Sequence, residues 1–256
     1  MTHPGGATML GEILLFKDNG LEFLFRWGHV LVGITWIGLL YFFNFVQAPA
    51  FAAMDAGARN NAMDKLTWRA LWWFRWAALM TFLTGLVLVY FITKDTTGFF
   101  KSARGVSISI GMLFGTVMFL NVWGIIWRKQ KIVIANARNV QAGGEADPLA
   151  PPAGRLALMA SRQNTIFSFP MLLLMVGSSH FFSISGSAAS DNRMGFLGIS
   201  ALIILVLELN ALGVMPWKTA PGKGLNWMYE SHKNAIISGL VLTVIVVAVG
   251  EGFLLH

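Results

Sequence analysis

Apolar residues gather along the chain into six long runs that polar connections separate. A helix needs about 20 apolar residues to cross about 30 Å of hydrocarbon, and these runs are long enough. Helices satisfy their own backbone hydrogen bonds in lipid, whereas a closed barrel would show short alternating strands, which are absent from these runs. The pattern therefore predicts an all-α integral membrane protein, a bundle of about six transmembrane helices that forms a single domain over residues 1–256. The runs cover approximately residues 21–46, 72–93, 105–127, 164–186, 194–215 and 233–254.

Two of the connections are long enough to have a structure of their own. Residues 47–71 are too polar to cross a membrane, but apolar residues recur in and just after them at helical spacing, which predicts an interfacial amphipathic helix. Residues 128–163 form the longest connection and contain the Gly-, Ala- and Pro-rich stretch NVQAGGEADPLAPPAGR, which predicts an extended or flexible loop. The recurring apolar residues of the first connection are Leu66, Trp68, Leu71 and Trp72.

The composition agrees with a membrane protein and excludes several classes of site. Hydrophobic residues make up 55% of the chain and charged residues only 12%, where a soluble domain carries about 25% charged residues. The chain has no cysteine, which excludes disulfides, thiolate metal sites, iron–sulfur clusters and covalently attached c-type haem. The net charge of +7 does not indicate a nucleic-acid partner, because the basic residues lie at the ends of apolar runs.

The distribution of Lys and Arg predicts the orientation in the membrane. If the six runs cross in turn, 13 of the 19 basic residues fall on one side, together with residues 47–71 and 128–163. The side richer in Lys and Arg is usually cytoplasmic. We therefore expect residues 128–163 to be a cytoplasmic loop, and both termini to lie on the opposite, outer side.

Two histidines lie inside the predicted spans, where ionisable residues often mark function. His29 lies about 12 Å from the outer end of the first run and His180 about 9 Å from the outer end of the fourth, at 1.5 Å per helical residue. Imidazoles at similar depth on antiparallel helices are what one haem b needs as axial ligands, so His29 and His180 are the predicted metal ligands. Structural hydrogen-bonded histidines, or a proton or substrate site, are the alternatives.

Two glycines lie near these histidines. Gly33 follows His29 by one turn and Gly177 precedes His180 by three residues, so each shares a helix face with its histidine. They would leave room for a flat macrocycle, or they would permit close packing of helices, as small residues commonly do in membranes.

Other residues around His29 are candidates for the same pocket. Arg26 precedes His29 by three residues and would pair with a haem propionate or an anionic substrate, or would extend to the headgroups. Trp27 and Trp36 flank His29 and would line a cofactor pocket or belong to ordinary packing.

Two further ionisable residues fall in or beside the last two runs. Glu208 lies within the fifth run and needs a partner or a proton, so a proton path and a structural hydrogen bond are both open. His232 begins the last run at the cytoplasmic edge, where an interfacial residue is the simpler interpretation.

Three segments carry a resemblance to a known family. RWGHVLVGITWIGLLYFF, RALWWFRWAALMTFLTG and NTIFSFPMLLLMVGSSHF resemble the N-terminal membrane domain of the bacterial membrane-bound, cytochrome c-linked urate hydroxylase (urate oxidase) family, over residues 21–254. The first contains a W-x-H-x-x-x-G-x-x-W-I-G-like pattern and the last an N-x-x-x-x-x-P-x-x-x-L-M-x-x-S-x-H-like pattern. The resemblance implies a bacterial inner-membrane protein in which His29 and His180 match the family's intramembrane histidines.

The chain also departs from that family. Full-length members carry a C-terminal cytochrome c domain, whereas this sequence ends just after its last run and has no cysteine. The resemblance therefore implies a stand-alone form with a separate cytochrome partner. Full-length members tend to have histidine near the position of Gln163, a difference that puts urate as the substrate in doubt.

Three functions are compatible with these features. The first is a membrane-bound haem b oxidoreductase or electron-transfer subunit that passes electrons from a small reductant to a cytochrome c partner. The second is a non-catalytic accessory subunit that packs in lipid against other subunits of a larger membrane complex. The third is a transporter with Glu208 and His232 on a proton path, which the lack of an internal repeat and of broken helices disfavours.

Overall fold

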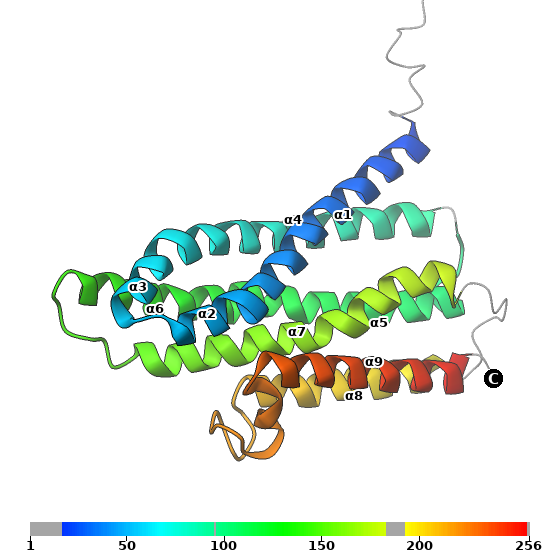
Figure 1. Cartoon of the computed structure of the whole chain (residues 1–256). Helices are drawn as coiled ribbons and strands as arrows, with labels where there is room; N and C mark the ends of the chain where they lie inside the picture. Colours follow the sequence, from blue (N-terminus) through cyan, green and yellow to red (C-terminus); the bar gives the residue numbers. More distant parts are fainter. Residues whose placement is uncertain (1–16, 95, 183–192, 255–256) are drawn as a thin grey trace, which may run out of the picture.

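The computed structural model describes residues 17–94, 96–182 and 193–254, and in these residues it is helical without a strand (Figure 1). The predicted all-α fold is confirmed. In Figure 1, α4 and the first half of α1 form an upper layer, α5, α6 and α7 a middle layer, and α8 and α9 a lower layer. The helices are α1 Asp18–Tyr41, η3 Phe42–Gln47, α2 Ala48–Ala53, α3 Ala56–Ala62, η4 Met63–Thr67, α4 Trp68–Lys94, η5 Phe99–Lys101, α5 Ala103–Asn121, η6 Val122–Ile126, α6 Trp127–Gln141, α7 Ala150–His180, α8 Arg193–Ala211, η7 Gly224–Tyr229 and α9 His232–Leu254.

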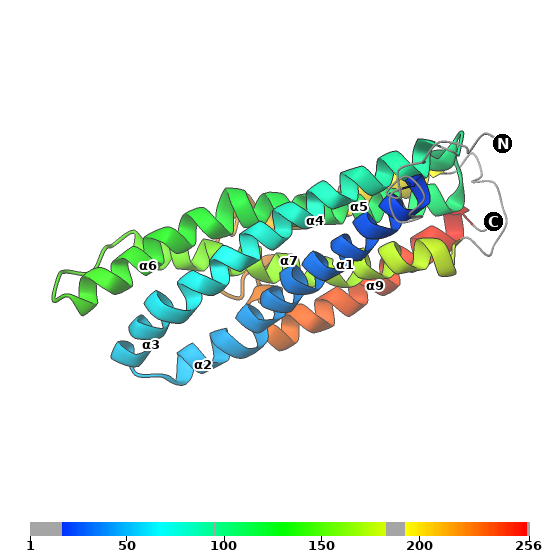
Figure 2. The ribbon, with the colours of Figure 1, turned by 90° about the horizontal axis from the view of Figure 1, so that it is seen from above.

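Five helical stretches of the described residues are long and apolar enough to cross a membrane, as a multi-pass membrane protein requires. The sixth predicted run lies in α7, which runs alongside the others (Figure 1) but is polar over its first half. The count of about six spans is therefore not confirmed. The beginning of α1 and the end of α9 lie at the same end of the bundle (Figure 2), as an even number of passes requires. The five stretches are Asn19–Ala53, Ala56–Lys94, Ala103–Gln141, Arg193–Ala211 and His232–Leu254.

Helix α7 is the centre of the molecule. It packs against α5, α6 and α9, whereas α1 packs mainly against α4. Glycines permit the close approach: a Cβ atom on Gly111 of α5 would come within 3.2 Å of Leu174 Cβ, and one on Gly239 of α9 within 2.5 Å of the Phe169 ring. Small residues at helix interfaces are typical of membrane bundles, because they let dispersion contacts form along the backbones.

The loop predicted over residues 128–163 is much shorter in the structure. α6 continues to Gln141 and α7 begins at Ala150, so only residues 142–149 are not helical. The proline-rich stretch lies in the first turn of α7, where proline costs no hydrogen bond and its fixed φ suits a helix. The predicted loop is found at residues 142–149 and was wrong for the helical residues on either side, since proline was counted there as a helix breaker.

Residues 47–71 form two helical segments that are joined at Met54 and Asp55, and not one amphipathic helix. α2 ends at Met54, whose backbone is extended, and Asp55 accepts a hydrogen bond from the N–H of Ala58 at 2.9 Å to begin α3. From α3 the chain continues through η4 into α4, and α3 packs against α6. The prediction of a single helix was therefore wrong, because the N-cap at Asp55 divides the segment. Its place at a membrane surface stays a prediction.

Candidate functional site

His29 lies half-buried between α1 and α4. Its Nδ1 atom is 3.0 Å from Oγ1 of Thr84, and the Thr84 hydroxyl donates to the carbonyl oxygen of Met80 at 2.7 Å. Because that hydroxyl proton is already used, Thr84 accepts a hydrogen bond from Nδ1–H of His29, and Nε2 is left as the ring's acceptor atom. The ring lies against Gly85, where a Cβ atom would come within 3.3 Å of Cε1.

His180 is exposed at the last turn of α7. Its Nδ1 atom is 3.0 Å from the carbonyl oxygen of Val176, and a carbonyl can only accept, so Nδ1 carries the proton here as well. Histidines that bind metals commonly donate one ring N–H to a carbonyl or another acceptor, which fixes the tautomer and frees the other nitrogen. By donor chemistry, both histidines fit an iron ligand.

The structure places the two histidines in different surroundings. The His29 ring is turned towards α4, whereas His180 is at the exposed end of α7. α1 does touch α7, but through its last turns, where Tyr41 Oη lies 2.9 Å from Ser168 Oγ. The first half of α1 rises away from α7 and crosses beside α4 (Figure 1). Among the described residues, no group of three or more His, Asp or Glu side chains could hold a metal ion.

The other residues predicted around His29 do not share one environment, because some are exposed and one is buried in the core. Arg26 pairs with Glu22, one turn earlier on the same helix, and the pair is exposed. Trp27 is 57% exposed, whereas Trp36 is 3% exposed and belongs to the hydrophobic core. The two tryptophans therefore do not line one pocket in this structure.

The two predicted glycines have ordinary space around them. A Cβ atom on Gly33 would lie 3.9 Å from Thr81 of α4, and one on Gly177 would lie 3.9 Å from Leu173 and Phe182. Gly33 therefore faces the α1–α4 contact, and the surroundings of Gly177 would accept a small side chain. Both positions agree with helix packing.

The structure also reveals a buried polar band on α7 that the sequence interpretation missed. It comprises six buried or half-buried side chains that the prediction divided between a loop and the start of a span. Their signal was visible as the polar run SRQNT before an apolar segment, but the prediction assigned its first three residues to the loop and its last two to the span. The members are Ser161, Arg162, Gln163, Asn164, Thr165 and Ser168.

Asn164 connects α7 to α5 and, through Asn121, to α8. Asn121 Nδ2 donates to Oδ1 of Asn164 at 3.0 Å and to Oε2 of Glu208 at 3.0 Å, while Asn164 Nδ2 donates to the carbonyl oxygen of Met118 at 2.9 Å. Asn121 is therefore the partner that Glu208 requires. This arrangement supports the structural hydrogen bond that was one of the two alternatives for Glu208.

Tyr229 is the second centre of the band. Its hydroxyl donates to Oε1 of Gln163 and accepts from Nδ2 of Asn210 at 3.2 Å, and its carbonyl oxygen accepts from Arg162. Tyr229 is fully buried, and burial raises the pKa of its phenol above the usual range, with the nearby Glu208 adding to the effect and the Asn210 hydrogen bond opposing it. The phenol is therefore a neutral structural donor.

An ion pair fixes the α8–α9 connection next to this centre. Nη2 of Arg155 lies 2.7 Å from Oε1 of Glu230, which also accepts from the N–H of Gly222 at 3.1 Å. Partial burial would raise the pKa of Glu230, but the hydrogen bonds and the charge of Arg155 outweigh it and lower the pKa. His232 is separate from this pair, since its ring centroid lies 6.4 Å from that of Phe45, and within the described chain no hydrogen bond joins it to Glu208.

Two π-helical segments adjoin the polar band. Asn44, in η3, donates to the hydroxyl of Ser161 at 2.9 Å and to the carbonyl oxygen of Leu40 at 2.9 Å. Asn121 lies directly before η6. π-Helical turns cost stability and occur frequently at functional sites, and here each of them directs an asparagine towards α7.

Comparison with known proteins identifies one family. No curated protein and no solved structure gives a significant match. Residues 95–207 match the family model described as "Urate oxidase N-terminal". The matched segment contains the polar band and His180, but it does not contain α1, on which His29 lies. The predicted resemblance is thus confirmed for residues 95–207, which are similar to the urate oxidase N-terminal family.

Proposed function

We propose that this chain is a membrane-bound redox protein related to urate oxidase, which passes electrons from a small reductant to a cytochrome c partner. Haem b would be its cofactor, and His29 and His180 would hold the iron. One observation carries the proposal: both imidazoles are held as Nδ1–H tautomers, by Thr84 and by the Val176 carbonyl, so that each has Nε2 available as a ligand atom.

The residues of this chain would orient the two ligand rings. Thr84 fixes the plane of the His29 ring, and Gly85 lets α4 approach that ring closely. The carbonyl oxygen of Val176 fixes the plane of the His180 ring from within α7. Haem b with two histidine ligands supplies one-electron transfer, since no coordination position is left open. Support for haem comes from the donor chemistry of the two rings and from the family match, which includes His180.

The substrate and location follow from the same family. The matched family is described as urate oxidase, so a purine such as urate is the proposed reductant class. We place the protein in the bacterial inner membrane with both termini in the periplasm, because the more basic connections then face the cytoplasm. The histidines would then lie in the periplasmic half, where a cytochrome c partner can take up electrons.

The absorbance spectrum of the purified protein tests haem binding. The full chain is expressed with haem supplementation, purified in detergent and reduced with dithionite. We expect the sharp reduced bands of a six-coordinate haem b, lost in His29→Ala and in His180→Ala but retained in the control His232→Ala. A colourless wild-type protein, or bands that survive both substitutions, would overturn the assignment.

A haem-free accessory subunit of a larger membrane complex is the second candidate function. Exposed apolar side chains of α8 and α9, among them Leu202 and Val244, favour it, because they can pack against other membrane subunits. Affinity purification from native membranes distinguishes the two. A colourless chain that co-purifies with a constant set of membrane subunits supports the accessory role, and a coloured chain that oxidises a purine without partners excludes it.

A further inference from the structure

A charged hollow lies at one end of the bundle, where η4 leads into α4 and α6 passes beside them. Its volume is about 430 Å³. This is the end of the molecule that carries α3 and α6 in Figure 2, away from the beginning of α1. The hollow is thus distant in the fold from the end at which both α1 begins and α7 ends. Its lining residues are Asp64, Lys65, Trp68, Arg69, Trp72 and Arg138.

The hollow has an excess of positive charge. Lys65 and Arg138 both pair with the single carboxylate of Asp64, each through a different oxygen. Arg69 donates one N–H to the carbonyl oxygen of Lys65 at 2.6 Å and is otherwise paired with no carboxylate among the described residues. With three cations against one carboxylate, the lining carries a net charge of +2.

The remaining donors suit a phosphate group. Arg138 binds Asp64 through Nε, so the two terminal nitrogens of its guanidinium are available to a ligand. Its guanidinium lies 5.1 Å from the centroid of the Trp68 ring, which in turn lies 5.1 Å from that of Trp127. The stacking orients the planar fork of donors, and such a fork is well matched to phosphate oxygens.

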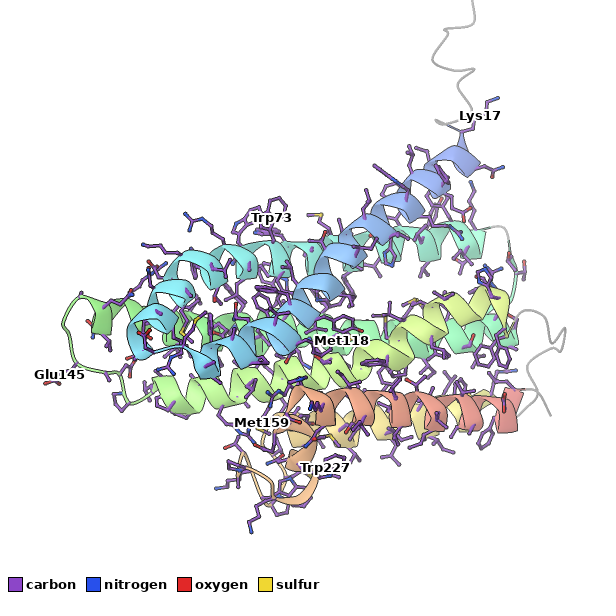
Figure 3. All side chains as sticks on the ribbon, in the orientation of Figure 1. Lys17, Trp73, Met118, Glu145, Met159 and Trp227 are labelled. Carbon is purple, nitrogen blue, oxygen red and sulfur yellow. The ribbon has the colours of Figure 1, made fainter. Side chains whose placement is uncertain are left out.

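The surface beside the hollow is apolar. Leu66, Trp72 and Trp73 are 50%, 46% and 61% exposed, and Trp73 lies on the outer side of α4 in Figure 3. α4 belongs to one of the stretches that can cross a membrane. Tryptophan is typical of the boundary between hydrocarbon and headgroups. A ligand that fills the hollow therefore meets cations at one end and a lipid-facing aromatic surface at the other.

We propose that this hollow is a binding site for the headgroup of an anionic phospholipid. The phosphate pairs with Lys65, Arg69 and the free end of Arg138, and the acyl chains lie along Trp72 and Trp73. A lipid suits the site better than free phosphate, because the exposed indoles would otherwise have no apolar partner. Basic sites between helices at the cytoplasmic side of the membrane commonly bind such headgroups. The site is independent of the proposed haem function.

Thermal unfolding of the full chain in a neutral detergent tests the site. Phosphatidylglycerol, phosphatidylcholine or inorganic phosphate is titrated against the wild type, the double variant Lys65→Gln/Arg69→Gln and the control Arg128→Gln/Lys223→Gln, which removes the same charge outside the hollow. We expect phosphatidylglycerol alone to raise the Tm of the wild type and of the control. The double variant should bind it at least about tenfold more weakly, since each basic residue near a membrane surface contributes about 1 kcal/mol.

Native mass spectrometry adds a readout that does not depend on stability. Wild type and control should retain bound phosphatidylglycerol, and a folded double variant should lose it. If the double variant does not fold, the single variant Arg69→Gln, which leaves the Asp64 pairs intact, takes its place. Equal binding in variant and wild type, equal shifts with phosphatidylcholine, or equal shifts with inorganic phosphate would overturn the proposal.

Discussion

The polar band of α7 and the two histidines lie in helices of the same bundle, but their side chains differ in how many of their polar atoms are hydrogen-bonded. In the band, Asn164 is fully buried and both ends of its amide are bonded to α5. His29 and His180 each have one ring nitrogen bonded and the other left as an acceptor. Asn164 therefore joins α7 to α5 with both ends of its amide, although Arg162 Nε and Gln163 Nε2 of the same band have no hydrogen-bond partner among the described residues. Each histidine is oriented through one nitrogen and keeps the other as an acceptor.

The difference shows how polar residues in a membrane bundle can be sorted. A side chain whose donors and acceptors are all used inside the protein has a structural role, since breaking any of its bonds leaves a buried polar group unpaired. A side chain that is fixed through one atom and open at another is prepared for a ligand. Glu208 is joined to the structural group through one carboxylate oxygen, which accepts from Asn121, although the sequence left its role open.

Asn164→Ala is expected to have the largest effect. It removes the acceptor of Asn121 and the donor to the Met118 carbonyl and leaves a cavity at a fully buried position. We expect the free energy of unfolding to fall by about 2–4 kcal/mol. Thermal unfolding in detergent measures the change. The exposed control Asn61→Ala should stay within about 0.5 kcal/mol, and a similar change in both variants would show that the band is not structural.

Tyr229→Phe tests the second centre of the band with a smaller change. The ring remains, but Gln163 loses the hydroxyl that donates to it and Asn210 loses an acceptor. We expect a loss of about 1–3 kcal/mol, measured by the same unfolding experiment. Tyr90→Phe removes a hydroxyl from a residue that is 62% exposed and should change little. If Tyr229→Phe leaves the free energy of unfolding unchanged, the Tyr229 hydroxyl does not have a structural role.

Thr84→Val should have the smallest effect on stability and tests the histidine end. It removes the acceptor of His29 Nδ1–H at a half-buried position, so the cost should be at most about 1 kcal/mol. Its main consequence is a less oriented imidazole, which in a haem-bearing preparation should shift the reduced absorbance bands or the reduction potential. Thr93→Val, which removes only a hydrogen bond to its own helix, is the matched control. Identical spectra for the two variants would show that Thr84 does not orient a haem ligand.

Several features followed from the sequence because they depend on local composition. The helical class, the positions of five membrane-competent helices and the urate oxidase-like segment were all predicted and confirmed. The predictions of the loop and of the amphipathic helix were wrong where each rested on a single sequence feature. Prolines at Pro151 and Pro152 were counted as loop residues although they suit the first turn of a helix. Asp55, an N-cap, was not recognised as the point that divides residues 47–71 into two helices.

The sequence by itself determined that this chain forms apolar helices, because hydrophobicity and helix length are properties of each segment alone. It also predicts His29 and His180 at similar depth, since depth is counted in residues along a helix. Only the tertiary structure decided which way those rings turn and which polar groups meet. Rotation about a helix axis and the choice of neighbouring helix depend on packing, and it is packing that bonds His29 to α4 and joins Asn121, Asn164 and Glu208 across three helices.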